Sequence, residues 1–360
     1  MFMNLSCGIV GLPNVGKSTL FNALLKKQAA LAANYPFATV EPNIGIVPVP
    51  DNRLNKLAKV IKVFEGLEVL PPLRPATIKF VDIAGLVKGA AKGEGLGNKF
   101  LAHVREVDLI INLLKDFEDK EIIKEGGINP KTDYEIVTEE LILKDLETVE
   151  KTKNVKVNKV KTQEDKKRQE VLEKLYQGLN KGKKARDILL SSELEIVRDL
   201  CLLTAKEEIK VFNVGERDER LKERTSKRNR LIICAKMEED LAGFSEEERQ
   251  EYLQTAQIKE TGLEKFIRVA YEKLNLISFL TAGVIEVRAW TITKGIKAPQ
   301  AAAVIHTDFE KKFIKVKICN YNDFIDFGGW KKCAEKGKVR FEGKDYEMMK
   351  NDVVEFMIGN

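Results

Sequence analysis

The sequence predicts an α/β fold with a mostly parallel sheet, an inserted helical hairpin and a smaller β-rich domain at the end of the chain. Near the start, a short apolar segment, a glycine-rich loop and a helical pattern follow one another. Apolar residues recur at helical spacing between residues 133 and 205, and with period two from Ile277 onward. The length of 360 residues favours two or three domains.

The composition indicates a chain that folds in water with reduced thiols. It is 44% hydrophobic and 32% charged, and it contains no run of about 18 apolar residues that would span a membrane. The first ten residues lack the basic start and apolar region of a signal peptide. The five cysteines are scattered and never spaced C-x-x-C, which argues against a disulfide or zinc framework. We therefore expect a cytoplasmic protein without a membrane partner, and we expect a monomer.

The segment from Gly11 to Thr19 matches the P-loop pattern G-x-x-x-x-G-K-[ST]. Leu5–Val10 before it suits a buried strand, and Thr19–Lys27 after it suits a helix. Glycines let backbone N–H groups face a phosphate, and a helix N-terminus adds a positive field. We expect Lys17 to contact the β- and γ-phosphates in catalysis and Ser18 to bind Mg²⁺. The predicted nucleotide contacts are Asn14, Val15, Gly16, Lys17, Ser18 and Thr19.

Two further segments carry residues typical of nucleotide switches. Thr39 lies in a proline-containing loop after the P-loop helix, where such proteins place a second magnesium ligand. The strand-like segment Thr77–Val81 leads into Asp82, a carboxylate suited to hold Mg²⁺ through a water molecule. Gly85 follows, and its backbone N–H is predicted to approach the γ-phosphate and couple it to a glycine-rich loop. We therefore add Gly85 to the catalytic residues, and Thr39 and Asp82 to the magnesium site.

The base-recognition segment differs from that of a GTPase. The strand Ile209–Phe212 ends in Asn213, Val214 and Glu216, where a GTPase would carry N-K-x-D. An aspartate there accepts hydrogen bonds from guanine, and an unmatched buried polar group weakens binding by about 1–3 kcal/mol. The three residues are predicted to contact the base, with backbone groups near Val214 reading adenine. This favours ATP over GTP, although a GTPase with a degenerate base motif remains an alternative.

At this point the residues resemble a known family, the Obg-like ATPases or YchF family of the translation-factor class of P-loop NTPases. The segments Gly11–Thr19, Tyr35–Asn43 and Asp82–Ala90 are close to what that family carries. Toward the end, Arg288–Thr291 and Lys297–Ala302 are similar to its C-terminal TGS domain, a β-grasp module. The resemblance spans essentially the whole chain. It implies an OBG-type G domain, a coiled-coil insert and a TGS domain.

The resemblance also implies slow, Mg²⁺-dependent ATP hydrolysis, with a hydrophobic residue in place of the catalytic glutamine of small GTPases. Here that residue is Leu86. The family commonly has a histidine in the strand after the glycine-rich switch, and this chain has Asn112 there. An amide can hydrogen-bond water but cannot accept a proton from it. Leu86 and Asn112 together leave the group that positions the attacking water unassigned.

The helical insert contains a basic segment. Residues 151–186 hold thirteen Lys or Arg against four Asp or Glu, an excess of nine that exceeds the whole-chain charge of +6. A solvated helix face and a contact with ribosomal RNA both account for it. The predicted domains are 1–132 with 206–276 for the nucleotide, 133–205 for the helical insert, and 277–360 for the TGS domain.

We therefore expect an ATP-hydrolysing molecular switch that needs Mg²⁺ and binds the ribosome or a ribosomal subunit. ATP is the expected nucleotide, with GTP weaker. Two alternatives remain: the GTPase with a degenerate base motif, and an RNA- or ribosome-binding protein whose nucleotide site is nearly idle.

Overall fold

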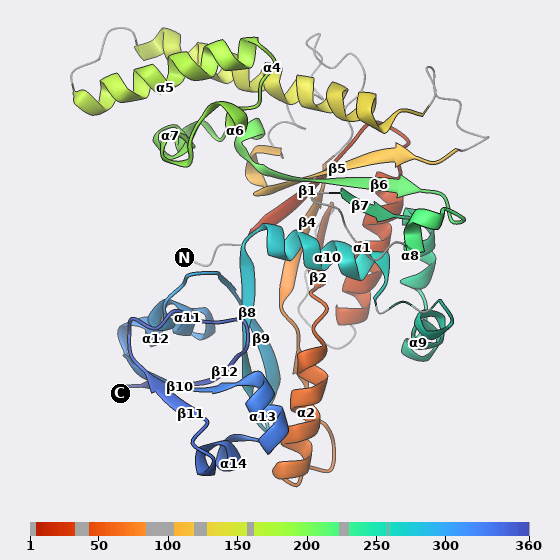
Figure 1. Ribbon diagram of the computed structural model, residues 1–360, viewed down its shortest axis with the longest axis vertical. Coiled ribbons are helices and arrows are strands. Elements are labelled where there is room, and N and C mark those ends of the chain that lie inside the picture. The colour runs from red at the N-terminus through yellow and green to blue at the C-terminus, as the bar shows by residue number, and fades with distance from the viewer. Residues whose placement is uncertain are drawn as a thin grey trace. The chain divides into compact units, whose positions relative to one another are not determined.

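The computed structural model describes residues 5–32, 43–83, 104–118, 128–156, 162–222, 230–256, 258 and 260–359 (Figure 1). Thr39, Gly85 and Leu86 lie outside the described residues. Contacts divide the chain into two units. The P-loop unit comprises Leu5–Gly45 and Lys79–Leu263, and the C-terminal unit comprises Ile46–Ile78 and Glu264–Asn360.

The sheet that carries the P-loop has six strands in the order β2-β4-β1-β5-β6-β7. The pairs β1–β4, β1–β5, β5–β6 and β6–β7 are all parallel, which confirms the predicted α/β class. Parallel strands place their carboxyl ends at one edge, where ligands bind in such folds. The strands are β1 (Ser6–Val10), β2 (Ile44–Pro48), β4 (Thr77–Asp82), β5 (Leu109–Asp116), β6 (Glu207–Val214) and β7 (Arg230–Ile233).

Helices accompany this sheet. The helix α1 (Lys17–Ala32) follows the P-loop and packs beside α8 (Ala235–Leu241). The short η4 (Glu219–Lys222) follows β6, and α9 (Glu246–Thr255) and α10 (Gly262–Lys273) come later in the chain. No helix in the described part of the chain combines the length and apolar character that a bilayer span requires.

The predicted helical hairpin is formed by α4 (Pro130–Lys156) and α5 (Gln163–Asn180), which run alongside each other (Figure 1). Val149, Leu172 and Leu175 are buried between them. A capping box begins α5, because the Thr162 hydroxyl accepts from the Asp165 N–H while the Asp165 carboxylate accepts from the Thr162 N–H. Four short helices return the chain to the sheet: α6 (Ala185–Ile188), α7 (Ser191–Ile196), η2 (Arg198–Leu200) and η3 (Leu203–Ala205).

The C-terminal unit has its own six-stranded mixed sheet, in the order β11-β10-β12-β8-β9-β3. Its strands are β3 (Leu73–Arg74), β8 (Leu276–Ala282), β9 (Val287–Thr293), β10 (Phe313–Asn320), β11 (Val339–Glu342) and β12 (Asp352–Ile358). The core contains Phe279, Ile292, Val316 and residues of α11 (Ala298–Ile305). The other helices are α2 (Asn52–Phe64), α12 (Asp308–Lys311), α13 (Tyr321–Phe327) and α14 (Trp330–Glu335).

The grouping of residues 46–78 differs from the predicted boundaries, which assigned them to the nucleotide-binding domain. In the structure β3 pairs with β9, and α2 packs against α13, β8 and β9. The amphipathic face of α2 explains this, because Leu54, Leu57 and Ile61 are buried in the C-terminal unit. Arg53 adds hydrogen bonds to the Lys350 and Ser278 carbonyl groups. A segment early in the chain thus completes the C-terminal unit.

Candidate nucleotide-binding site

The P-loop has a backbone that only glycine allows at two positions. Gly16 has a φ of 93°, and a Cβ there would lie 2.3 Å from Asn213 Nδ2. A Cβ on Gly11 would lie 2.5 Å from the Leu113 carbonyl oxygen. Both distances are far below van der Waals contact, so the motif glycines are required for close backbone approach. The helix α1 begins directly after this loop, with the Leu20 N–H donating to the Gly16 carbonyl at 3.0 Å.

Lys17 is folded back onto the loop that precedes it. Its Nζ donates to the carbonyl oxygens of Gly11 at 2.9 Å and Leu12 at 3.0 Å. Burial lowers the pKa of Lys17, and the charge of Asp82 opposes that shift. The ammonium group therefore has two neutral acceptors and one nearby carboxylate. A bound polyphosphate would provide charged acceptors, which form stronger hydrogen bonds with an ammonium.

Asp82 ends β4, beside the P-loop strand, where it is the register partner of Ile9. Its Oδ1 is buried and has no hydrogen-bond partner among the described residues. Burial raises the pKa of Asp82, while Lys17 lowers it. An unpartnered carboxylate oxygen suits a hard cation such as Mg²⁺, or a water bound to it. Ser18, in the first turn of α1, has an exposed side chain, and its hydroxyl oxygen is a second suitable ligand for Mg²⁺.

Asn213 connects the P-loop to the base side of the site. It is buried at the end of β6, where its Nδ2 donates to the Val15 carbonyl at 2.9 Å. Its Oδ1 accepts from the Ala235 N–H, also at 2.9 Å, at the start of α8. Sequence reasoning predicted a nucleotide contact for Asn213. In the structure the nitrogen and the oxygen of the Asn213 side-chain amide both bond to backbone groups of the protein. Asn213 therefore holds the P-loop and the start of α8 in place.

The other two base-side residues have different surroundings. Val214 is buried. The Glu216 carboxylate lies 3.1 Å from Lys236 Nζ, and both side chains are largely exposed. The hydrogen bond with Glu216 raises the pKa of Lys236. The carboxylate at the position that reads guanine in a GTPase is therefore paired with a lysine in the first turn of α8.

An arginine that sequence reasoning missed fixes the loop after β6. Arg220 donates to Asp218 and to Asp116, each at 2.6 Å. Asp116 ends β5, so the arginine links the ends of two adjacent strands. Hydrogen bonds with both carboxylates raise the pKa of Arg220 despite its partial burial. The only sequence signal was the run of charged residues Glu216–Arg220 shortly after the end of β6.

Asn112, which stands where the family has histidine, contacts Glu208. It is buried on β5, and its Nδ2 donates to Glu208 Oε2 at 3.2 Å. Glu208 Oε1 in turn accepts from the Tyr134 hydroxyl at 2.7 Å and from Lys184 Nζ at 2.6 Å. We call Asn112, Tyr134, Lys184 and Glu208 the insert-base cluster. It joins two sheet strands to both ends of the helical hairpin.

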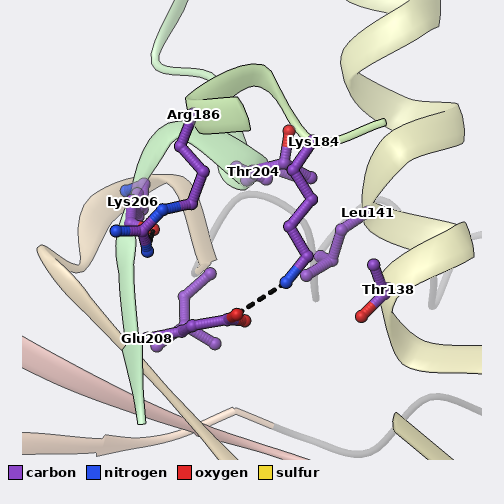
Figure 2. Close-up of a pocket in the computed structure, with 9 residues that line it drawn as sticks. Thr138, Leu141, Lys184, Arg186, Thr204, Lys206 and Glu208 are labelled. Atoms are coloured by element: carbon purple, nitrogen blue, oxygen red, sulfur yellow. Dashed lines mark hydrogen bonds and ion pairs between the residues drawn. The ribbon is translucent and has the colours of Figure 1, made fainter. Parts of the chain in front are cut away.

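A small pocket lies beside this cluster. Figure 2 shows Lys184 pointing toward Glu208. Arg186 of α6, Lys206 just before β6 and Thr138 of α4 also line the pocket. The three cations already have partners. Arg186 donates to the Lys206 carbonyl and to Glu207, and Lys206 donates to the Arg105 and Val107 carbonyl groups. The pocket is therefore part of the junction between the hairpin and the sheet.

A buried carboxylate, Asp145, holds the same junction. Asp145 on α4 accepts from the N–H groups of Leu203 and Thr204, each at 2.8 Å, and from the Thr204 hydroxyl at 2.6 Å. The Thr204 hydroxyl oxygen accepts from the Ala185 N–H at 2.9 Å. Burial raises the pKa of Asp145, and the hydrogen bonds from Thr204 and Leu203 lower it. These contacts tie the hairpin to the segment that leads into β6.

A glycine-dependent loop that joins a buried strand to a helix N-terminus, beside a parallel strand ending in aspartate, defines a P-loop nucleoside-triphosphatase. A family model described as a 50S ribosome-binding GTPase matches residues 6–181. A second, YchF-GTPase_C, described as a protein of unknown function, matches residues 276–359. The chain belongs to the YchF family, as the relatives below show.

Curated relatives and a solved structure match nearly the whole chain. Two proteins named ribosome-binding ATPase YchF are 43% identical in Bacillus subtilis, covering 98% of this chain and 99% of that protein, and 45% identical in Escherichia coli O157:H7, covering 99% of each. The solved structure of the Schizosaccharomyces pombe YchF GTPase aligns with a TM-score of 0.84 at 40% identity, covering 98% of both chains. The predicted family and fold class are therefore confirmed.

Proposed function

We propose that this chain is a Mg²⁺-dependent ATPase that acts as a molecular switch on the ribosome. The observation that carries the proposal is that Lys17 and Asp82, whose charges influence each other, are both incompletely satisfied beside the P-loop. The lysine has only neutral hydrogen-bond acceptors, and the carboxylate has an unpartnered oxygen among the described residues. Names of the curated relatives support both ATP hydrolysis and ribosome binding.

In this proposal the loop from Asn14 to Thr19 binds the phosphates through backbone N–H groups. Lys17 leaves the carbonyl groups of its own loop and stabilises negative charge on the β- and γ-phosphates. Ser18 and Thr39 would hold Mg²⁺, with Asp82 acting through a water molecule. When bound, the metal neutralises charge on the phosphate oxygens that separate during hydrolysis. Gly85 would connect the γ-phosphate to the following loop through its backbone N–H.

Turnover in this proposal is slow without a partner. Leu86 has no polar group to orient the attacking water. The Asn112 amide donates to Glu208, at the base of the helical insert. In small GTPases a glutamine orients the attacking water. Neither Leu86 nor Asn112 takes over that role in this proposal, so the water is not oriented. The ribosome would then supply the missing positioning, as partner proteins do for other switches.

We propose a preference for ATP over GTP. The support is that Glu216 is one methylene longer than the usual aspartate and is paired with Lys236. A GTPase with a degenerate base motif is the competing interpretation. Affinities for ATP and GTP, measured side by side with fluorescent analogues, distinguish the two. Tighter binding of GTP would overturn the preference.

Phosphate release under multiple turnover tests the hydrolysis itself, with and without ribosomes. We expect slow release that depends on Mg²⁺ and increases when ribosomes are added. Co-sedimentation with ribosomes in the presence of a non-hydrolysable ATP analogue or ADP tests the switch. Equal binding in the two states would favour an RNA- or ribosome-binding protein with a nearly idle nucleotide site. We also propose a cytoplasmic monomer, whose monomeric state is tested by sedimentation of the free protein and whose location is tested by cell fractionation.

A further inference from the structure

The turn that follows β6 carries the predicted base-side carboxylate. It comprises residues 215–218, directly after Val214, the last residue of β6. The Asp218 N–H donates to the Gly215 carbonyl at 3.1 Å, which closes the segment into one tight turn. The short η4 begins at the next residue. We call residues 215–218 the base loop.

Arg220 grips the far end of the base loop with its guanidinium. Nε and Nη2 donate to the two carboxylate oxygens of Asp218, at 2.8 and 2.6 Å. Nη1 is directed elsewhere and donates to Asp116 Oδ2 at 2.6 Å. The Arg220 backbone N–H also donates to Asp218 Oδ1 at 2.9 Å. A planar guanidinium that bonds to two carboxylates at once has a fixed orientation, so Arg220 joins the base loop to the end of β5.

The end of β5 lies against the base loop at a second point. Asp116 is the register partner of Val214, and a Cβ on Gly215 would lie 4.0 Å from the Phe117 Cβ. Arg220 is therefore the cation between two carboxylates, one on β5 and one in the loop. Without that cation, Asp116 and Asp218 would repel each other and the loop would lose its attachment to β5.

The other side-chain contacts of the base loop are weaker. Glu216 and Lys236 are 51% and 74% exposed, so their ion pair adds little rigidity. Arg217 is exposed, and its side chain has no hydrogen bond or ion pair within the ranges that the structure describes. The Arg220–Asp116 pair is the less exposed one, at 34% and 19%. The order of the base loop beyond β6 therefore depends mainly on Arg220.

We propose that Arg220 is a positioning residue for the base of the bound nucleotide. It holds the base loop, with Glu216 and the backbone beside Val214, in the conformation that contacts adenine. A loop that becomes ordered only on binding uses part of the binding energy for that ordering, whereas a preformed loop does not. In this proposal Arg220 acts through the loop and makes no contact with the nucleotide. The inference rests on the proposed ATP site and adds to it a residue far from the P-loop in the sequence.

Equilibrium binding of ATP and of inorganic tripolyphosphate to the full chain tests the proposal. Arg220→Ala should weaken ATP binding about tenfold, because the loop must then be ordered by the base. Tripolyphosphate has no base and should bind Arg220→Ala as it binds the unmodified protein. Arg217→Ala is the matched control, since it removes the same charge from the same loop at an exposed position. An equal loss of affinity for both ligands would overturn the proposal, because Arg220 would then support the whole site.

Steady-state hydrolysis gives an independent test. Arg220→Ala should raise KM for ATP about tenfold and change kcat less than about twofold, since base contacts are the same in the ground state and the transition state. A fall in kcat with an unchanged KM would overturn the proposal. Arg220→Lys should resemble Arg220→Ala, because an ammonium cannot reproduce the fork between Asp116 and Asp218.

A double-mutant cycle tests whether Arg220 acts through β5. Asp116→Ala alone should weaken ATP binding, and adding it to Arg220→Ala should weaken binding no further, because both changes remove the same link. Fully additive effects would overturn the proposal. If the unmodified protein binds neither ATP nor tripolyphosphate, the proposed function fails as well. If it binds both ligands and Arg220→Ala binds ATP as tightly as Arg217→Ala, this inference alone fails.

Discussion

Asp145, which is buried, and Asp82, which is half-buried, differ in the hydrogen-bonding capacity that each leaves unused in the P-loop unit. Asp145 accepts three hydrogen bonds, all from the segment that follows the helical hairpin. Asp82 has an oxygen with no partner among the described residues. Burial raises the pKa of both. Asp145 therefore uses its hydrogen-bonding capacity for the fold, while Asp82 keeps some of it for a ligand.

Two lysines in the same unit show the same contrast. Burial alone would lower the pKa of Lys184, but its hydrogen bonds with Glu208 and Tyr134 outweigh burial and the pKa is raised. Burial lowers the pKa of Lys17, whose hydrogen-bond acceptors are two neutral carbonyl oxygens. A charged group in a binding site is left partly unsatisfied, and its stabilisation comes with the ligand. The predictions below test this contrast.

Lys17→Ala should have the largest effect, lowering ATP hydrolysis about a hundredfold to a thousandfold. The reason is that no other described side chain of the P-loop carries a positive charge to the phosphates. Phosphate release under multiple turnover measures this. Lys26→Ala is the control, because Lys26 lies on the same helix and donates to the Glu239 carbonyl. A Lys17→Ala variant with an unchanged rate would show that the site is assigned wrongly.

Asp145→Ala should lower the free energy of unfolding by about 3 kcal/mol, because it leaves the buried Leu203 and Thr204 N–H groups without an acceptor. Urea unfolding monitored by circular dichroism measures the change. Glu147→Ala is the matched control on the same helix, since its exposed carboxylate pairs with Lys144 and with nothing buried among the described residues. Equal stabilities of the two variants would contradict the structural role of Asp145.

Asp82→Asn should do the opposite, raising the melting temperature by about 2–4 °C at pH 7 while lowering hydrolysis at least tenfold. The native pKa of Asp82 is raised, so its ionised form disfavours the folded state at neutral pH. As the pH falls through the native pKa toward the ordinary value of 3.8, the wild-type carboxyl becomes protonated in the folded state and the advantage of the amide disappears. Melting curves at pH 7 and pH 4.5 measure this. If Asp82→Asn were less stable than the wild type at pH 7, the Asp82 carboxylate would stabilise the fold, as that of Asp145 does.

The sequence predicted the P-loop, the parallel sheet and the hairpin because each rests on a local pattern. The Gly11 and Gly16 positions follow directly from the motif. The contacts of Asn112 and Arg220 could not be predicted, since their partners lie 96 and 104 residues away. The placement of Ile46–Ile78 was also missed, because β3 has only two residues and carries no period of its own.

Tyr134→Phe should lower the free energy of unfolding by about 1 kcal/mol, because the Glu208 carboxylate loses one of its three donors. The ring remains, and with it the contact of Lys210 Nζ at 3.5 Å from its centroid. Tyr176→Phe is the control, since that ring also lies under a lysine but its hydroxyl has no partner in the described part of the hairpin. Urea unfolding again provides the measurement. ATP affinity should be unchanged, and a loss of affinity would assign the insert-base cluster to the nucleotide site.

Glu216→Asp should have the smallest effect, a few-fold shift of relative affinity from ATP toward GTP. The shorter carboxylate would move away from Lys236 and toward the position that accepts from guanine in GTPases. Because both side chains are largely exposed, the ion pair that is lost contributes at most about 1 kcal/mol. Lys236→Ala removes the same pair without shortening Glu216, so a shift in both variants assigns the preference to the pair. A shift in Glu216→Asp alone would assign the nucleotide preference to the length of the side chain. If neither Glu216→Asp nor Lys236→Ala shifts the preference, backbone groups near the buried Val214 would account for it.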